Sequence, residues 1–328
     1  MYEMEKGNIM RTRQFGKTDM RITPLGLGTW AIGGGKWEFA WGSQDDKESI
    51  ATIHRALELG INWIDTAAVY GLGHSEEIVG QALKERGGER PYVFTKCSRV
   101  WNEKGELSGS LKADSIKREV ENSLRRLQVD AIDLYQMHWP NPDPDIEEGW
   151  STMAQLKKEG KVRYIGVSNF NVEQMQRAES IAHVDSLQPP YSLVHPDVEK
   201  DVLPYCEQQN IGVIVYSPMM SGLLTGSMNQ ERVQNMPEDD WRKRNPEFQE
   251  PRLSRNLELA NLLSEIGYPH NVPPGVVAIA WTLRNPVVTA AIVGGRRPQQ
   301  IEDLVPAAEF RLNESEMTQI DRFLQEHP

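Results

Sequence analysis

Short runs of β-branched and aromatic residues alternate along this chain with longer stretches in which apolar residues recur every three or four positions. In one longer stretch Ile50, Ile53, Leu57 and Ile61 form a single apolar stripe, which is typical of an amphipathic helix packed on a sheet. The alternation predicts a parallel sheet covered by helices. The eight predicted strands are residues 25–29, 62–65, 92–96, 132–138, 162–168, 185–188, 212–216 and 288–293.

The number of these units indicates the fold class. Eight strand–helix units favour an α/β fold of the (β/α)8 TIM barrel type, because an open doubly wound sheet usually has fewer strands and a switch point. Ahead of the first unit, residues 13–15 and 20–22 flank a Gly-Lys-Thr-Asp turn. We expect them to form a β-hairpin that closes the floor of the barrel.

The remaining segments define the expected boundaries of the domain. Residues 217–251, after the seventh strand, form a long irregular loop of the kind that often serves as a functional lid. Residues 314–325 predict a closing helix. We expect residues 1–10 to be a frayed N-terminal extension and residues 11–328 to form a single barrel domain.

The charge and the cysteine content narrow the choice of partners. The 328-residue chain has a formal net charge of −11, which repels nucleic acid and anionic membranes, so we expect neither as a partner. Its two cysteines, Cys97 and Cys206, are too few for a disulfide framework and suit a reducing compartment. No apolar stretch approaches the roughly 20 residues that span a bilayer, and the polar start lacks a signal sequence. These features predict a cytoplasmic protein.

One glycine-rich segment imitates a dinucleotide-binding motif. Residues 26–31, Gly-Leu-Gly-Thr-Trp-Ala, match the G-x-G-x-x-A spacing directly after a strand. A Rossmann loop must open straight into a helix that holds the pyrophosphate, yet here three further glycines follow and no helical period begins before about Asp45. We therefore interpret the segment as a strand end that leads into a loop.

Reactive side chains stand where three predicted strands end. Asp65, Lys96 and His138 end the second, third and fourth strands, and Tyr70 lies in the loop after Asp65. In a barrel these ends form the active site, and the cost of burying charged groups there predicts that they pair with one another. We expect Asp65 to keep Lys96 charged and Lys96 to lower the pKa of Tyr70, making it a general acid near neutral pH. His138 would donate an N–H to a substrate carbonyl oxygen, so the four residues predict carbonyl reduction.

The segments around these residues resemble those of a known family. Residues 60–71, Gly-Ile-Asn-Trp-Ile-Asp-Thr-Ala-Ala-Val-Tyr-Gly, are similar to the aldo-keto reductase signature around its catalytic Asp and Tyr. Thr95-Lys96 and residues 133–138 resemble that family's Lys and His strands. The resemblance covers residues 26–303. It implies a barrel enzyme that reduces aldehydes and ketones to alcohols with NADPH, usually without a metal, and with Tyr70 as proton donor.

The resemblance also implies a site for NADP(H). Ser168, Asn169 and Gln188 correspond to residues that hydrogen-bond the nicotinamide carboxamide, and Tyr216 to the ring that stacks on the nicotinamide. Arg296 corresponds to an arginine that binds the 2′-phosphate, which favours NADP over NAD. The implied cofactor set is Gly28, Thr29, Trp30, Asp65, Ser168, Asn169, Gln188, Tyr216, Ser217, Pro218, Met219, Gly222, Leu223, Gly294, Gly295, Arg296, Gln300 and Asp303.

Further candidates rest on position alone. Arg244 lies in a basic segment of the long loop, where it is either a clamp on the cofactor's pyrophosphate or an ordinary solvated charge. Aromatic residues near the strand ends predict an apolar pocket for a small carbonyl substrate. The proposed substrate pocket consists of Trp30, Tyr70, Trp101, His138 and Trp139.

Other classes of function lack their motifs. The histidines show no metal-ligand spacing, so we expect no metal site, and neither a nucleophile elbow nor a P-loop occurs. Two alternatives stay open. One is oxidation of a sugar, polyol or pyridoxine alcohol, and the other is a cofactor-sensing regulatory subunit similar to potassium-channel β subunits. The sequence leaves the substrate, the direction of reaction, the strictness of the preference for NADP and the oligomeric state undecided.

Overall fold

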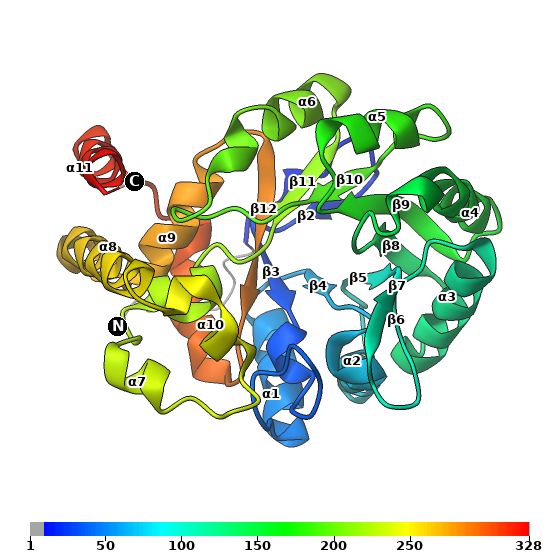
Figure 1. Cartoon of the computed structure of the whole chain (residues 1–328), viewed down its shortest axis with the longest axis horizontal. Coiled ribbons are helices and arrows are strands. Elements are labelled where there is room, and N and C mark those ends of the chain that lie inside the picture. The colour runs from blue at the N-terminus through cyan, green and yellow to red at the C-terminus, as the bar shows by residue number, and fades with distance from the viewer. Residues whose placement is uncertain (1–9, 328) are drawn as a thin grey trace.

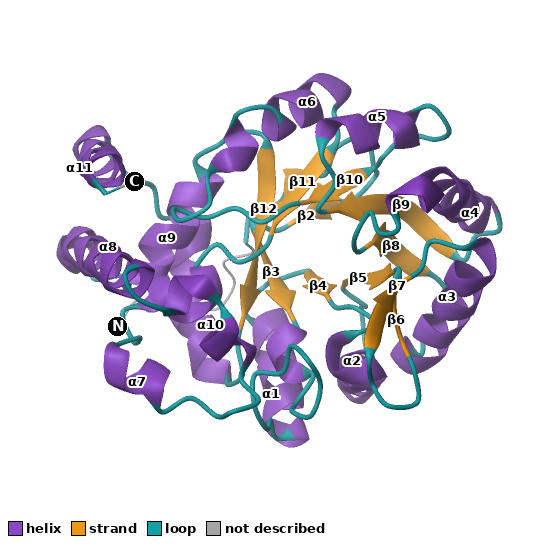
Figure 2. Cartoon of the chain, viewed as in Figure 1, coloured by secondary structure: helices purple, strands orange, loops and turns teal. Residues whose placement is uncertain are grey.

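A ring of eight parallel strands forms the centre of the computed structural model, which describes residues 10–327. Figure 1 shows this ring with the helices outside it, and Figure 2 separates the two layers by colour. Neighbouring strands follow the closed order β10-β11-β12-β3-β4-β5-β8-β9. The strands are β3 Leu25–Gly28, β4 Trp63–Asp65, β5 Tyr92–Cys97, β8 Ile132–Met137, β9 Val162–Ser168, β10 Ser186–Gln188, β11 Gly212–Val215 and β12 Val288–Gly294. The predicted (β/α)8 barrel is confirmed, and each predicted strand is present.

The helices follow the apolar stripes of the sequence. In α1, Ile50, Ile53 and Leu57 are buried, and the Asp45 side chain caps the helix start by accepting from the Glu48 N–H at 2.9 Å. The predicted closing helix is present as α11. The helices are α1 Asp46–Glu58, α2 His74–Arg86, α3 Ala113–Leu127, α4 Ile146–Lys158, α5 Val172–Glu179, α6 Val202–Gln209, α7 Gln230–Gln234, α8 Arg252–Gly267, α9 Pro274–Leu283, α10 Pro298–Leu304 and α11 Glu314–Glu326.

The expected hairpin, β1 (Arg13–Gln14) with β2 (Arg21–Ile22), closes the end of the barrel at which the strands begin. Phe15, just after β1, is fully buried and stacks on Phe94 of β5 with the ring centroids 5.9 Å apart. A Cβ at Gly212, the first residue of β11, would lie 2.5 Å from the Phe15 ring. Only glycine at this position therefore leaves room for the Phe15 side chain.

Side chains that point into the barrel alternate along each strand and separate into two layers. Trp63, Phe94 and Leu134 belong to one buried apolar cluster with Phe15. Two residues further along the same strands stand Asp65, Lys96 and Gln136. Because side chains two apart lie on the same face of a strand, an apolar layer supports a polar layer above it.

Two segments differ from the sequence prediction. A hairpin that was not predicted, β6 (Arg99–Trp101) with β7 (Leu107–Gly109), follows β5. The loop over residues 217–251 is not irregular throughout, because α7 and several short helical turns lie within it.

The expected frayed extension falls on residues 1–9, which lie outside the described residues, whereas Met10 is described and is buried. None of the helices in residues 10–327 is both long enough and apolar enough to cross a membrane.

Candidate active site

A buried ion pair lies at the centre of the polar layer. The Lys96 ammonium on β5 contacts Asp65 Oδ1 on β4 at 2.5 Å and donates to the Thr66 carbonyl at 2.8 Å. Lys96 is 1% exposed and Asp65 is 3% exposed. Burial lowers the pKa of Lys96, and Asp65 opposes that shift. Pairing compensates the cost of removing the two charges from water, as the sequence predicted.

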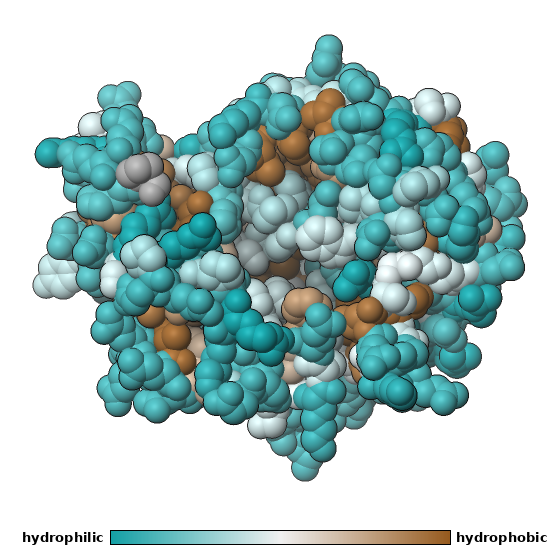
Figure 3. Space-filling view, in the orientation of Figure 1, coloured by the Kyte–Doolittle hydropathy of each residue, from teal (hydrophilic) through white to brown (hydrophobic). Residues whose placement is uncertain are grey.

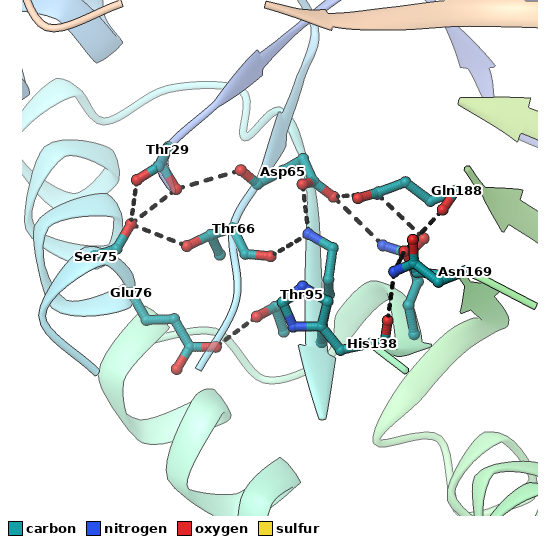
Figure 4. A network of polar contacts seen from close by, with 12 residues as sticks. Thr29, Asp65, Thr66, Ser75, Glu76, Thr95, His138, Asn169 and Gln188 are labelled. Carbon is teal, nitrogen blue, oxygen red and sulfur yellow. Dashed lines mark hydrogen bonds and ion pairs between the residues drawn. The ribbon is translucent and has the colours of Figure 1, made fainter. Parts of the chain in front are cut away.

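Two glutamine side chains contact the second carboxylate oxygen of Asp65, Oδ2. Gln188 Nε2 donates to Asp65 Oδ2 at 2.8 Å (Figure 4). Gln136 Nε2 lies 3.4 Å from the same atom. Gln188 was predicted to face the cofactor, whereas Gln136 was missed. Its signal was present, because Gln136 is two residues before His138 and therefore faces into the barrel.

Tyr70 and His138 lie over this pair. The Lys96 ammonium is 5.2 Å from the centre of the Tyr70 ring, and the rings of Tyr70 and His138 are 5.7 Å apart at 80°. The turn that carries Tyr70 is fixed by close packing. A Cβ at Gly71, which has a φ of 61°, would lie 2.1 Å from the carbonyl oxygen of Gly33. The structure therefore brings together the three strand-end residues Asp65, Lys96 and His138 and the loop residue Tyr70.

The protonation states differ from our expectation at one residue. Burial raises the pKa of Tyr70 well above its ordinary value, and the negative charge of Asp65 adds to the increase. The prediction that Lys96 lowers the pKa of Tyr70 is therefore wrong for this structure. The Lys96 charge is paired with Asp65 and does not outweigh desolvation, which dominates at Tyr70. Burial, with smaller contributions from the positive charges of Lys96 and Arg99, lowers the pKa of His138 well below its ordinary value.

A chain of hydrogen bonds joins His138 to the neighbouring strand ends. Asn169 Nδ2 donates to the His138 carbonyl at 2.9 Å, and the Tyr216 hydroxyl donates to Asn169 Oδ1 at 2.7 Å. The Ser168 hydroxyl donates to the Gln188 carbonyl at 2.7 Å. These contacts fix the side chains that the family resemblance places at the nicotinamide end of a cofactor.

A cavity of about 1200 Å³ opens above these residues, and Figure 3 shows the hollow near the centre of this face. Most of the predicted site residues line it. They are Gly28, Thr29, Trp30, Asp65, Tyr70, His138, Trp139, Ser168, Asn169, Gln188, Tyr216, Ser217, Pro218, Met219, Gly222, Gly294, Gly295, Arg296, Gln300 and Asp303. The volume exceeds the usual range of small-ligand sites, so it has room for a large cofactor together with a small substrate.

The backbone after β11 is strained where it lines the cavity. Ser217, Met220 and Ser221 have φ values of 56°, 48° and 53°, and Gly222 has a φ of 96°. Non-glycine residues in this region cost conformational energy and cluster at ligand sites. Successive turns of this kind also direct backbone N–H groups into one concavity, an arrangement that binds phosphate. The segment is therefore suited to bind phosphate, and it contains Ser217, Pro218, Met219 and Gly222 of the implied cofactor set.

Arg296 links β12 to the loop that follows β3. Its guanidinium donates to Gln44 Oε1 at 2.6 Å, to the Trp41 carbonyl at 3.1 Å and to the Ser43 carbonyl. Its backbone N–H donates to Gln300 Oε1 at 2.8 Å. Each of these partners is uncharged. They therefore do not compensate the positive charge of the guanidinium, which lines the cavity.

Three indoles join the loops on either side of the cavity. Trp30 is 4.9 Å from Trp241 and 5.4 Å from Trp41, measured between ring centroids, and we call these three residues the tryptophan cluster. The backbone N–H of Trp241 donates to the Ala40 carbonyl at 3.1 Å, and the Arg242 guanidinium lies 4.5 Å from the Trp41 ring centre. The long loop after β11 thus packs on the loop after β3.

Four predicted site residues do not line the cavity, and one of them, Lys96, lies beneath it in the ion pair with Asp65. Arg244 donates instead to the Glu38 carbonyl, Leu223 is buried in the core, and Trp101 lies in the β6–β7 hairpin. Arg242, which was not predicted as a site residue, is the arginine of that basic segment that lines the cavity. Which of two neighbouring arginines faces inward depends on the turn at Asp240, whose carboxylate binds Arg242 at 2.6 Å. Within residues 10–327, no group of three or more His, Cys, Asp and Glu side chains could hold a metal ion.

Comparison with known proteins agrees with this geometry. The model of the aldo/keto reductase family matches residues 24–325. The aldo-keto reductase YhdN of Bacillus subtilis is 41% identical over 310 residues, which cover 94% of this chain and 92% of the relative. The NADH-specific methylglyoxal reductase of Escherichia coli is 34% identical over 322 residues, which cover 94% of this chain and 97% of that protein.

A solved structure extends the likeness to three dimensions. The glycerol dehydrogenase AKR11B4 from Gluconobacter oxydans superposes with a TM-score of 0.86 at 38% identity, over 96% of this chain and 95% of that one. The barrel, the buried polar layer at the strand ends and these matches along nearly the whole chain lead to one conclusion. The chain belongs to the aldo/keto reductase family.

Proposed function

We propose that the protein reduces aldehydes or ketones to alcohols with NADPH, and that Tyr70 is the proton donor. The observation that carries the proposal is the position of Tyr70 and His138 on the wall of the cavity, directly above the buried Lys96–Asp65 pair. When bound, the nicotinamide supplies the hydride. The chain supplies the proton, the orientation of the carbonyl group and the exclusion of water.

The raised pKa of Tyr70 suits a proton donor. Tyr70 keeps its proton at neutral pH, and an alkoxide is basic enough to remove it as the carbonyl is reduced. The charge that develops on the phenol faces the Lys96 ammonium, which stabilises it. A neutral His138 retains one N–H, which can donate to the carbonyl oxygen.

The same pKa favours reduction over oxidation near neutral pH. Oxidation of an alcohol requires Tyr70 to accept a proton, and a tyrosine with a raised pKa is rarely ionised at pH 7. One similar protein is named a glycerol dehydrogenase, so the reverse reaction is the second candidate. Measuring initial rates in both directions between pH 6 and 10 separates the two, because a faster oxidation at pH 7 would contradict the proposed direction.

We infer NADP(H) rather than NAD(H) from the arginines beside α10. The Arg296 guanidinium has only uncharged partners at the cavity wall, and Arg297 adds a second positive charge next to it. A 2′-phosphate would compensate both charges. One similar protein is named as NADH-specific, which makes NAD(H) the second candidate cofactor.

The cofactor experiment compares NADPH and NADH in binding and in turnover. We expect Arg296→Gln to weaken NADPH binding about 10-fold or more, as loss of a charged hydrogen bond does, and to change NADH binding little. Tight NADH binding by the unchanged protein, without a preference for NADPH, would overturn the assignment.

The activity experiment uses purified protein, NADPH and a panel of simple aldehydes. We expect the protein to oxidise NADPH, measured as a loss of absorbance at 340 nm. We expect Tyr70→Phe to lower kcat about 100-fold or more, because the general acid is removed. Absence of turnover, together with retained cofactor and a stably bound membrane protein, would favour the regulatory-subunit alternative. We further propose a cytoplasmic location, since Cys97 and Cys206 are buried unpaired thiols.

A further inference from the structure

Arginines occupy several positions on the wall of the cavity, and most of them are engaged. The Arg242 guanidinium is held by Asp240 at 2.6 Å, and Arg232 donates to the Ser227 carbonyl at 3.0 Å. The five lining arginines are Arg99, Arg232, Arg242, Arg296 and Arg297. Within residues 10–327, the Arg99 guanidinium makes neither an ion pair nor a hydrogen bond.

Arg99 lies away from the arginines assigned to the cofactor phosphate. It is the first residue of β6, three residues after Lys96, whereas Arg296 and Arg297 follow β12. In the barrel order, β3 and β4 separate β12 from β5. Arg99 therefore belongs to the side of the cavity where β5 and β8 end.

The backbone around Arg99 is firmly held. Ser98, with a φ of 75°, turns the chain out of β5, its N–H donates to Glu119 at 2.9 Å, and its hydroxyl contacts the Trp139 carbonyl at 3.2 Å. Arg99 then pairs with Gly109, where a Cβ would lie 2.5 Å from the Asn141 carbonyl oxygen. The hairpin is thus packed against the segment after β8, which positions the arginine before any ligand arrives.

The surroundings of Arg99 contain the reacting group but no free carboxylate. The charge of Arg99 contributes to the lowered pKa of His138, and Leu107 and Trp139 line the same part of the cavity. Asp65 is the nearest lining carboxylate along the barrel order, and it is engaged by Lys96. Arg99 is only partly buried and lines the cavity, and no lining carboxylate within residues 10–327 pairs with its guanidinium.

We propose that Arg99 binds the carboxylate of a substrate that carries a carbonyl group and a carboxylate on one small molecule. The planar guanidinium matches a carboxylate with two parallel hydrogen bonds. One positive charge compensates a single carboxylate, whereas a phosphate dianion would remain half uncompensated. This inference rests on the proposed carbonyl reduction and names the substrate class of the same site.

The test compares 4-carboxybenzaldehyde with 4-carbamoylbenzaldehyde, its uncharged counterpart of similar size, each with NADPH. We expect the ratio of kcat/KM, charged over uncharged, to exceed one in the unchanged protein and to fall about 10- to 100-fold in Arg99→Met, mainly through KM. Arg99→Lys should keep part of the ratio. Lys104→Met, which removes an exposed charge from the tip of the same hairpin, should leave the ratio as it is.

A second measurement needs no variant. Since the preference arises from charge, raising the salt concentration should lower the ratio for the unchanged protein. A ratio that is the same in Arg99→Met and the unchanged protein, with both aldehydes reduced, would overturn the role of Arg99. If neither aldehyde nor any simple aldehyde is reduced, the reductase proposal itself fails, so the two failures are distinguishable.

Discussion

The Lys96 ammonium and the Asp65 carboxylate are 2.5 Å apart and almost fully buried at the ends of adjacent strands. The pair lies under Tyr70 and carries the charge that the proposed chemistry requires. Gln188 and Thr66 satisfy the remaining polar atoms around it, at 2.8 Å each. A buried pair of this kind depends on both partners, because either charge alone would be left without compensation.

Breaking this pair on one side should destabilise the fold. We expect Lys96→Met to lower the free energy of unfolding by about 3–5 kcal/mol, since it leaves Asp65 charged and buried. Adding Asp65→Asn should restore much of the stability but none of the activity. Urea denaturation measures the first effect and NADPH oxidation the second. The exposed pair of Lys200 and Asp197 is the control, and Lys200→Met should change stability little. Equal stability losses at both sites would contradict the argument.

The pH dependence of reduction follows from two shifted groups. Burial raises the pKa of Tyr70, so Tyr70 holds its proton throughout the neutral range and loses it only above about pH 10. Burial lowers the pKa of His138, so its ring stays neutral down to below about pH 6.5. We expect kcat/KM for reduction to be flat between pH 6.5 and 9. A decline with an apparent pKa near 7 or 8 would show that a different group donates the proton.

The tryptophan cluster should control how fast the cofactor enters and leaves. Trp241 packs on Trp30 at 4.9 Å and on Trp41 at 5.9 Å, so it joins the two loops across the cavity. We expect Trp241→Ala to accelerate both binding and release of NADPH by about 2- to 10-fold, because each aromatic contact contributes about 0.5–1.5 kcal/mol. Stopped-flow fluorescence measures both rates. Unchanged rates would mean that the cofactor passes elsewhere.

Gly26 should tolerate no side chain. An added Cβ would lie 2.1 Å from the Trp63 indole, which fills the barrel interior. We expect Gly26→Ala to cost about 1–3 kcal/mol of unfolding free energy, as overpacking does. Gly294→Ala is the matched control, because a Cβ there meets only the Gly28 carbonyl oxygen at 3.9 Å. Denaturation without cofactor compares the two, and a small loss for Gly26→Ala would show that the indole can move aside.

Much of this fold and site follows from local pattern. The apolar alternation identified all eight barrel strands, and their ends identified Asp65, Lys96 and His138 as neighbours. This succeeds because parallel strands in a barrel place their carboxyl ends at one edge, so position along a strand determines position in space. Gln136 could have been found by the same two-residue period.

Other features depended on contacts between distant segments. The pKa of Tyr70 rises because its side chain is buried and because the charge of Asp65 adds to the increase, and no spacing in the sequence states either effect. Likewise, Arg242 rather than Arg244 faces the cavity because of how one turn packs.

The sequence by itself determined the barrel and the residues gathered at its mouth, because both follow from short-range periodicity. Only the tertiary structure decided the protonation of those residues, the meeting of the two loops at the tryptophan cluster and the absence of a partner for the Arg99 guanidinium among residues 10–327. Each of these depends on desolvation and on partners far away in the chain, and such terms are set by packing rather than by local pattern.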